Sequence, residues 1–194
     1  MRNLKILVIN VCLRPYKPQI MFPLGLSYVV EAIKRAGYDF EILDLDRYRK
    51  TDEEIMDYLR GHKFDVVAMG CIATGYKTVK RLCQMARETQ KDATIVVGNS
   101  VADSIPKLLL EKTEADVSVI GEGEISMVEV LDKLKNEGND PTEVLNQSTM
   151  KCWQGLFEIN KTGGFNGAQS DTGRVVGAAA PQPGKYAKLT LNKS

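Results

Sequence analysis

Residues Ala115–Ile125 read Ala-Asp-Val-Ser-Val-Ile-Gly-Glu-Gly-Glu-Ile, an apolar run that ends in two glycines and leads into a helical pattern. In open α/β sheets, a strand, a glycine-containing turn and a helix N-terminus in this order form a ligand-binding corner. Glycine permits a positive φ or a close approach of the backbone, and the first turn of a helix leaves N–H groups unpaired. Five such strand-to-helix corners occur along the chain, and this is the last of them.

Short apolar runs alternate with helical patterns over residues 1–136. This alternation predicts an α/β domain in which helices cover both faces of a parallel sheet. Right-handed crossovers favour a flavodoxin-like doubly wound sheet of five strands in the order 2-1-3-4-5. The predicted strands are Leu4–Asn10, Tyr38–Leu45, Phe64–Gly70, Thr94–Val97 and Val117–Ile120.

The helical segments place their apolar residues on one face, at positions i, i+3, i+4 and i+7. Thr51 and Glu54 have the spacing of a capping box at the start of one helix. Further helices are predicted near Asp103–Glu111 and from Ile125 to about Lys135. The two clearest apolar faces are Leu26, Val29, Val30 and Ile33, and Val79, Leu82, Cys83 and Ala86.

The character of the sequence changes after Asn136. Residues 136–141 form a linker, and Trp153–Ile159 with Arg174–Val176 are predicted to form a small hairpin. The rest of the segment is predicted to be an extended, flexible tail. We therefore divide the chain into a domain of residues 1–136 and a linker, hairpin and tail of residues 137–194.

The composition excludes several classes of function. The chain has 26 basic and 25 acidic residues, so it lacks the basic excess on which non-specific nucleic-acid binding depends. No apolar stretch approaches the ~20 residues needed to cross a bilayer, and the N-terminus lacks a signal-peptide pattern, so we expect a cytoplasmic protein without a membrane partner. The four cysteines are scattered and predict neither disulfides nor a zinc site.

The strand-to-helix corners lack the motifs of the common nucleotide-binding, phosphate-accepting and hydrolytic sites of such sheets. The first strand ends in Asn10-Val11-Cys12, without the glycine-rich turn of a dinucleotide site, and a Walker A loop is absent. A phosphoryl-accepting receiver would need an acid where Gly70 ends the third strand. The single histidine, His62, precedes that strand on the side opposite the binding loops, so no nucleophile–histidine pair is predicted.

The remaining feature is a crevice at the carboxyl edge of the sheet, which is where such folds bind ligands. It is bounded by the loops 11–23, 71–76, 98–101 and 121–124, which are rich in small residues. Thr74, Asn99 and Ser100 are candidate hydrogen-bond donors. Each glycine by itself is explained by a turn, but four corners that open on one edge favour a binding function.

Several segments together resemble a known family. They are Phe22–Tyr28 (Phe-Pro-Leu-Gly-Leu-Ser-Tyr), Ala32–Tyr38, Phe64–Gly70, Ile95–Gly98 and Asp116–Glu124, in this order and spacing. Over about residues 1–136 the chain resembles the N-terminal cobalamin (B12)-binding domain of B12-dependent radical S-adenosylmethionine enzymes.

The resemblance implies a cofactor and its contacts. Cobalamin would lie over the carboxyl edge of the sheet with its nucleotide tail in the crevice. An Asp-x-His-x-x-Gly motif is absent, which implies base-off cobalamin without a histidine ligand. No catalytic residue and no protein metal ligand is predicted. The predicted cofactor contacts are Cys12, Leu13, Thr74, Gly75, Gly98, Asn99, Ser100, Gly121, Glu122 and Gly123.

The resemblance also implies a partner. The Cys-x-x-x-Cys-x-x-Cys motif that holds a 4Fe-4S cluster for S-adenosylmethionine does not occur in the sequence. The chain is therefore expected to carry cobalamin for a radical S-adenosylmethionine domain in cis or in trans, for methyl transfer or tetrapyrrole ring closure. Two alternatives stay open: a ligand-free interaction domain, and a small enzyme that acts on a nucleotide or sugar with Glu122 or Glu124 as the acid.

Overall fold

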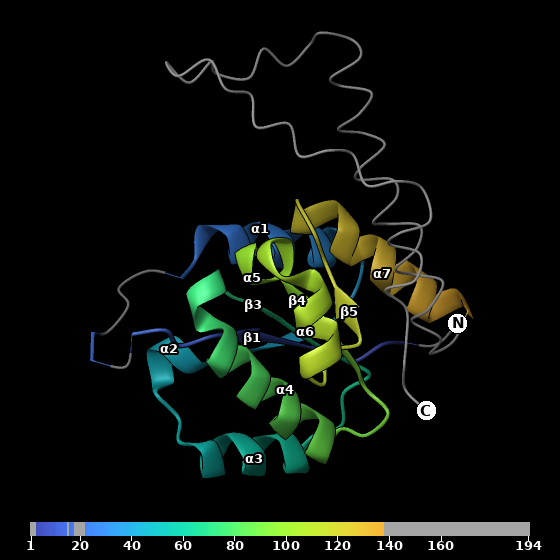
Figure 1. Cartoon of the computed structure of the whole chain (residues 1–194). Helices are drawn as coiled ribbons and strands as arrows, with labels where there is room; N and C mark the ends of the chain where they lie inside the picture. The colour runs from blue at the N-terminus through green and yellow to red at the C-terminus, as the bar shows by residue number, and fades with distance from the viewer. Residues whose placement is uncertain (1–2, 15, 18–21, 138–194) are drawn as a thin grey trace, which may run out of the picture.

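The computed structural model describes residues 3–14, 16–17 and 22–137. These residues form a five-stranded, all-parallel sheet with the order β2-β1-β3-β4-β5, as predicted (Figure 1). The strands are β1 (Ile6–Asn10), β2 (Phe40–Asp44), β3 (Val66–Gly70), β4 (Thr94–Gly98) and β5 (Val117–Ser118).

The register aligns the carboxyl ends of the central strands. Asn10, the last residue of β1, lies opposite Asp44 of β2 and Gly70 of β3. Gly70 in turn lies opposite Gly98, the last residue of β4. Four strands therefore end at one level, and the chain order reverses between β1 and β3, at the point where doubly wound sheets bind their ligands.

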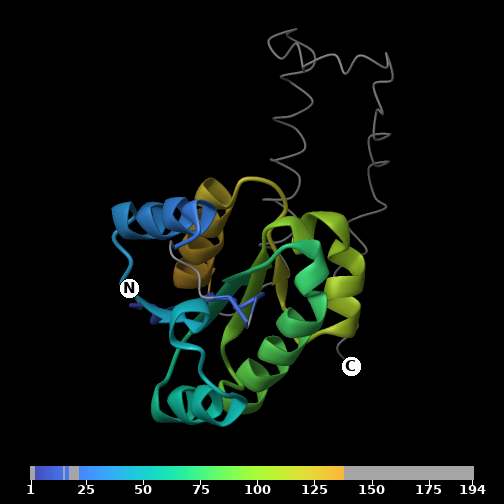
Figure 2. The ribbon, with the colours of Figure 1, turned by 90° about the vertical axis from the view of Figure 1, so that its left-hand side faces the viewer.

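Helices cover both faces of the sheet, and Figure 2 shows them on either side of the strands. The helices α1 (Leu24–Arg35) and α7 (Gly123–Glu137) contact each other on one face. On the other face lie α3 (Asp52–Gly61), α4 (Tyr76–Thr89), α5 (Ser100–Ser104) and α6 (Pro106–Lys112), whose buried residues belong to one core cluster. The short α2 (Leu45–Tyr48) follows β2, and a single 3-10 turn, η1 (Ala73–Gly75), precedes α4.

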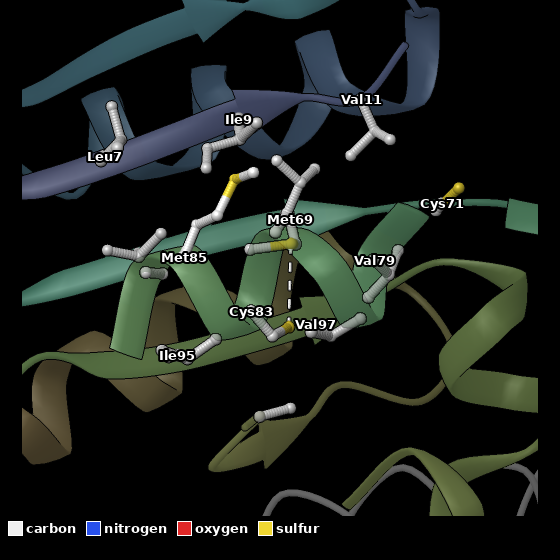
Figure 3. Packing of buried hydrophobic residues seen from close by; sticks show 14 of the residues in the cluster. Leu7, Ile9, Val11, Met69, Cys71, Val79, Cys83, Met85, Ile95 and Val97 are labelled. Atoms are coloured by element: carbon white, nitrogen blue, oxygen red, sulfur yellow. Dashed lines mark hydrogen bonds between the residues drawn. The ribbon is translucent and has the colours of Figure 1, made fainter. Parts of the chain in front are cut away.

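Alternate residues of a strand point to opposite faces of the sheet, and each face has its own hydrophobic core. Leu7 and Ile9 of β1 pack beneath α3 and α4, whereas Ile6 and Val8 pack beneath α1 and α7. Figure 3 shows the first core, in which Cys83 of α4 lies against Met69 of β3 with their sulfur atoms 4.0 Å apart. Cys83 is completely buried, so its interpretation as a small core residue is confirmed.

The predicted apolar faces of α3 and α4 are confirmed, whereas on α1 only Ile33 is buried and the rest of the predicted face is partly buried. Val79, Leu82, Cys83 and Ala86 are buried on α4, and Ile55 and Leu59 are buried on α3. The capping box at α3 is also present: Glu54 N donates to Thr51 Oγ1 at 3.3 Å, and Thr51 N donates to Glu54 Oε2 at 2.7 Å.

The structure corrects two kinds of predicted boundary and adds one helix. Four of the strands are shorter than predicted, because buried flanking residues such as Leu4 lie outside the paired ladder, whereas β4 is one residue longer, since Gly98 pairs with Gly70. The helix predicted near Asp103–Glu111 is two helices, since Pro106 starts α6 and removes an N–H donor. The helix α2 was not predicted; Asp44 caps it by accepting from Arg47 N at 3.0 Å.

The predicted hairpin and tail lie outside the described residues, as does most of the segment 137–194. Within the described part, none of the helices is both long and apolar enough to cross a bilayer.

A buried amide holds the amino-terminal edge of β3. Gln90, which follows α4, donates through Nε2 to His62 O at 2.9 Å and to Leu59 O, and it accepts from Phe64 N at 3.0 Å. All three partners are backbone groups, one in the last turn of α3 and two in the connection from α3 to β3. The side chain therefore ties the end of α4 to the start of a central strand.

We expect Gln90→Met to destabilise the fold by about 2–4 kcal/mol, because it leaves buried backbone groups without partners. Chemical denaturation followed by circular dichroism measures this difference. Gln84→Met is the matched control, since Gln84 lies exposed on the same helix and bonds to Glu88 at 3.0 Å. Equal effects of the two substitutions would contradict the assigned role of Gln90.

Cys71 and Leu13 lie so close to the backbone of residue 75 that this position requires glycine. A Cβ atom at this position would lie 2.0 Å from Cys71 Sγ and 2.7 Å from Leu13 Cδ2. Gly75 is buried in η1, so the corner after β3 closes only because residue 75 has no side chain.

We expect Gly75→Ala to cost about 1–3 kcal/mol through overpacking. Cys71→Ala removes the sulfur atom that an added methyl group would strike. The double variant should therefore be more stable than the sum of the two single effects predicts. Thermal unfolding of the wild type, the two single variants and the double variant measures this difference. Strict additivity would show that Cys71 is not the obstacle.

Candidate functional site

A cavity of about 720 Å³ lies at the carboxyl edge of the sheet, above the switch point between β1 and β3. The strand ends supply its floor through Asn10, Gly70 and Gly98. The helix α1 supplies one wall, with Leu26 and Val29 among its residues. Most of the lining is apolar, so the site favours a large ligand with an apolar body.

Four of the predicted contacts line this cavity: Leu13, Gly98, Asn99 and Gly123. Leu13 is 37% exposed at the cavity mouth. Asn99 follows β4 with a φ of 68°, and its Oδ1 accepts from Ser100 N at 2.6 Å. Because both residues line the cavity, the loops after β1 and β4 meet at one site.

Six predicted contacts are not among the lining residues: Cys12, Thr74, Gly75, Ser100, Gly121 and Glu122. The corners after β3 and β4 are bonded to each other instead. Ala73 N donates to Ser100 Oγ at 3.2 Å, and Val101 N donates to Cys71 O at 3.0 Å. The first bond uses the hydroxyl oxygen of Ser100, one of the predicted contacts, and Thr74 lies exposed in the 3-10 turn beside it.

The two glycines of the corner between β5 and α7 have different roles. Gly121 has a φ of 80°, and its N–H donates to Asp103 Oδ1 at 2.8 Å. Gly123 begins α7, where a Cβ would lie 2.9 Å from Val29 Cγ2 of α1. The second glycine therefore allows α7 to pack against α1 at the cavity. Glu122 between them is exposed.

Buried polar residues at the ends of β1 and β2 were missed from the sequence. Asn10 is 4% exposed, and its Nδ2 donates to Asp44 Oδ1 at 2.8 Å. Asp46 is 3% exposed and lines the cavity, yet its Oδ2 has no hydrogen-bond partner among the described residues. The acidic pattern Asp44-Leu45-Asp46 directly after an apolar run was the signal that could have indicated the two carboxylates.

Arg49 was also missed. It ends α2 in the left-handed region, at φ 50° and ψ 40°, and its guanidinium lies 3.3 Å from Asp46 Oδ1. The same group donates to Cys12 Sγ at 2.8 Å. No local sequence pattern marks an arginine for this conformation, because its partners lie both in α2 and in the distant loop after β1.

The thiols at this edge are poor nucleophiles. Burial raises the pKa of Cys71 to about 11. Burial also raises the pKa of Cys12, and the nearby Asp46 carboxylate adds to this effect. Both groups are therefore neutral at pH 7, when only a thiolate would attack.

The described residues offer little for metal or acid–base chemistry. They contain no group of three or more His, Cys, Asp or Glu side chains placed to hold a metal ion. His62 ends α3 at the opposite, amino-terminal edge, where its Nδ1 lies 2.8 Å from Tyr58 O. The one histidine of the sequence therefore does not reach the cavity.

Comparison with known proteins agrees with this geometry. The B12 binding domain family matches residues 17–131, which is more than half of the chain. A second family, the YdaU C-terminal domain, matches residues 122–183, most of which lie outside the described residues.

Two curated relatives are methyltransferases by name. The chain is 24% identical over 160 residues to cytidylyl-2-hydroxyethylphosphonate methyltransferase from Streptomyces wedmorensis, covering 72% of this chain and 30% of that protein. It is 32% identical over 123 residues to hopanoid C-3 methylase from Methylococcus capsulatus, covering 60% and 23%. The chain thus spans less than a third of the length of these relatives.

A solved structure shows the same fold. The radical S-adenosylmethionine methyltransferase TsrM from Kitasatospora setae superimposes with a TM-score of 0.59 at 21% sequence identity, covering 73% of this chain and 27% of that one. The match to residues 17–131, on a sheet of this order with a cavity at its switch point, identifies the chain as a member of the B12 binding domain family.

Proposed function

We propose that this chain binds cobalamin in the cavity at the carboxyl edge of its sheet and acts as a carrier domain. The observation that carries the proposal is the cavity itself, which lies at the switch point between β1 and β3 in a member of the B12 binding domain family. Bound cobalamin supplies a cobalt centre that can carry a methyl group. The chain's own residues supply the binding site.

The residues at the cavity fit such a ligand. Its apolar lining suits the flat body of a corrin and a benzimidazole base, and Gly70 and Gly98 leave the strand ends uncovered by side chains. The unpartnered Oδ2 of Asp46 is a buried acceptor beside the cavity. Cobalamin has many peripheral amides, and an N–H donor from one of them would offset the cost of leaving this oxygen unpaired.

We infer that cobalamin binds in the base-off form and that no histidine of this chain replaces the base. His62 is the only histidine in the sequence, and it lies at the edge of the sheet away from the cavity. The thiol of Cys71, which does line the cavity, is held neutral by burial. The ten cofactor contacts predicted from the sequence, of which Cys12 is the first and Gly123 the last, remain predictions.

A radical S-adenosylmethionine domain, in cis or in trans, is the proposed partner. The relatives named above are methyltransferases several times longer than the matched region, and this sequence lacks the three-cysteine motif of an iron–sulfur cluster. In this proposal residues 1–136 hold cobalamin and residues 137–194 lead toward the partner. Methyl transfer is the favoured reaction, with the cytoplasm as its location.

We expect the purified chain to bind hydroxocobalamin saturably and to shift its visible spectrum to the base-off form. In the cob(II)alamin state, electron paramagnetic resonance should show no nitrogen hyperfine splitting from an axial ligand. Gly98→Leu should weaken binding at least about tenfold, because a side chain there fills space at the end of β4. An added Cβ at Gly98 meets only Val119, at 3.7 Å, so the strand tolerates the change.

Gly61→Leu is the matched control. Gly61 ends α3 at the opposite edge of the sheet, and an added Cβ meets nothing within 4 Å. This variant should bind like the wild type. Absence of binding by the wild type would contradict the proposal and favour a ligand-free interaction domain, whereas a nitrogen signal would contradict the base-off assignment.

A further inference from the structure

A single arginine ties the loop after β1 to the end of α2. Arg49 donates through Nη1 to Arg14 O at 2.7 Å and to Cys12 Sγ at 2.8 Å, and through Nη2 to Lys17 O at 2.6 Å. The planar guanidinium has five donors in a fixed fork, so it can hold three acceptors of one loop at the same time. The path of this loop beside the cavity therefore depends on Arg49.

The arginine is itself held in place. Its backbone lies in the left-handed region, which side chains other than glycine seldom adopt. Such a conformation persists where the surrounding contacts determine it. Here the nearly buried carboxylate of Asp46 pairs with the guanidinium at 3.3 Å, and Arg49 N donates to Leu45 O at 3.1 Å.

The residues that Arg49 holds bring positive charge to the cavity. Arg14 and Lys17 both line it, in a wall that is otherwise mostly apolar. The carboxylate in that wall, Asp46, is already paired with Arg49. The end of the cavity next to the loop after β1 therefore carries an excess of positive charge and suits an anionic group on a large apolar ligand.

We propose that Arg14 and Lys17 form a subsite for the phosphodiester of a cobalamin nucleotide tail, and that Arg49 is the residue that positions them. This inference rests on the proposed function. The phosphodiester is the anionic group of cobalamin's periphery, where the remaining side groups are neutral amides. Arginine and lysine both bind phosphate oxygens through charge-assisted hydrogen bonds.

The test compares cobalamin with cobinamide, which has the corrin and its amides but no nucleotide base, ribose or bridging phosphodiester. Equilibrium dialysis of the full chain against each ligand gives both dissociation constants. The double variant Arg14→Gln/Lys17→Gln should bind cobalamin about tenfold more weakly, since hydrogen bonds to charged groups are lost. Its affinity for cobinamide should not change.

Arg49→Met should reproduce this selective loss, although Arg49 does not itself line the cavity. Raising the salt concentration should weaken cobalamin binding by the wild type more than by either variant, because screening acts on the charged contacts that the variants lack. Arg81→Met is the control; Arg81 forms an exposed ion pair with Asp52 at 3.2 Å, on the α3–α4 side. Thermal unfolding of each variant monitors the fold.

Three results would overturn the inference. Unchanged cobalamin affinity in Arg14→Gln/Lys17→Gln would exclude the anion subsite. Equal losses of cobalamin and cobinamide in Arg49→Met, with a lowered Tm, would make Arg49 a support of the fold alone. Failure of the wild type to bind either ligand would instead contradict the proposed function, and the subsite with it.

Discussion

The register in which β1 pairs with β2 and β3 is the constraint on which the rest of the site depends. Backbone hydrogen bonds on both sides of β1 bring Asn10, Asp44 and Gly70 to one level, and Gly98 follows through β3. A slip of one residue would turn Leu7 and Ile9 away from their core. Burial on both faces therefore fixes where the strands end, and the strand ends fix the floor of the cavity.

Polar groups near that floor fall into two kinds. Those after β3 and β4 bond to each other, through Ala73 N to Ser100 Oγ and Val101 N to Cys71 O, and they close the corners. After β2, in contrast, Asp46 Oδ2 has no hydrogen-bond partner among the described residues. The cavity is thus asymmetric, with an apolar centre and a charged end beside the loop after β1.

Neither a thiolate nor an imidazole of the described residues lies in the cavity. Burial keeps the thiols at the edge neutral, and the only histidine of the sequence lies at the opposite edge. In the carrier function proposed above, the ligand and a partner would supply the chemistry.

The sequence by itself determined the sheet, its strand order and the edge at which the cavity lies. These follow from local periodicity, glycine-bearing corners and the handedness of crossovers, all of which can be read from neighbouring residues. Only the tertiary structure decided which side chains reach the cavity. Thr74 and Ser100 looked available in sequence but lie at corners bonded to each other, whereas Asp46 and Arg49 gained their places through contacts between α2 and the loop after β1. Such contacts join residues about 35 positions apart, and no local pattern encodes them.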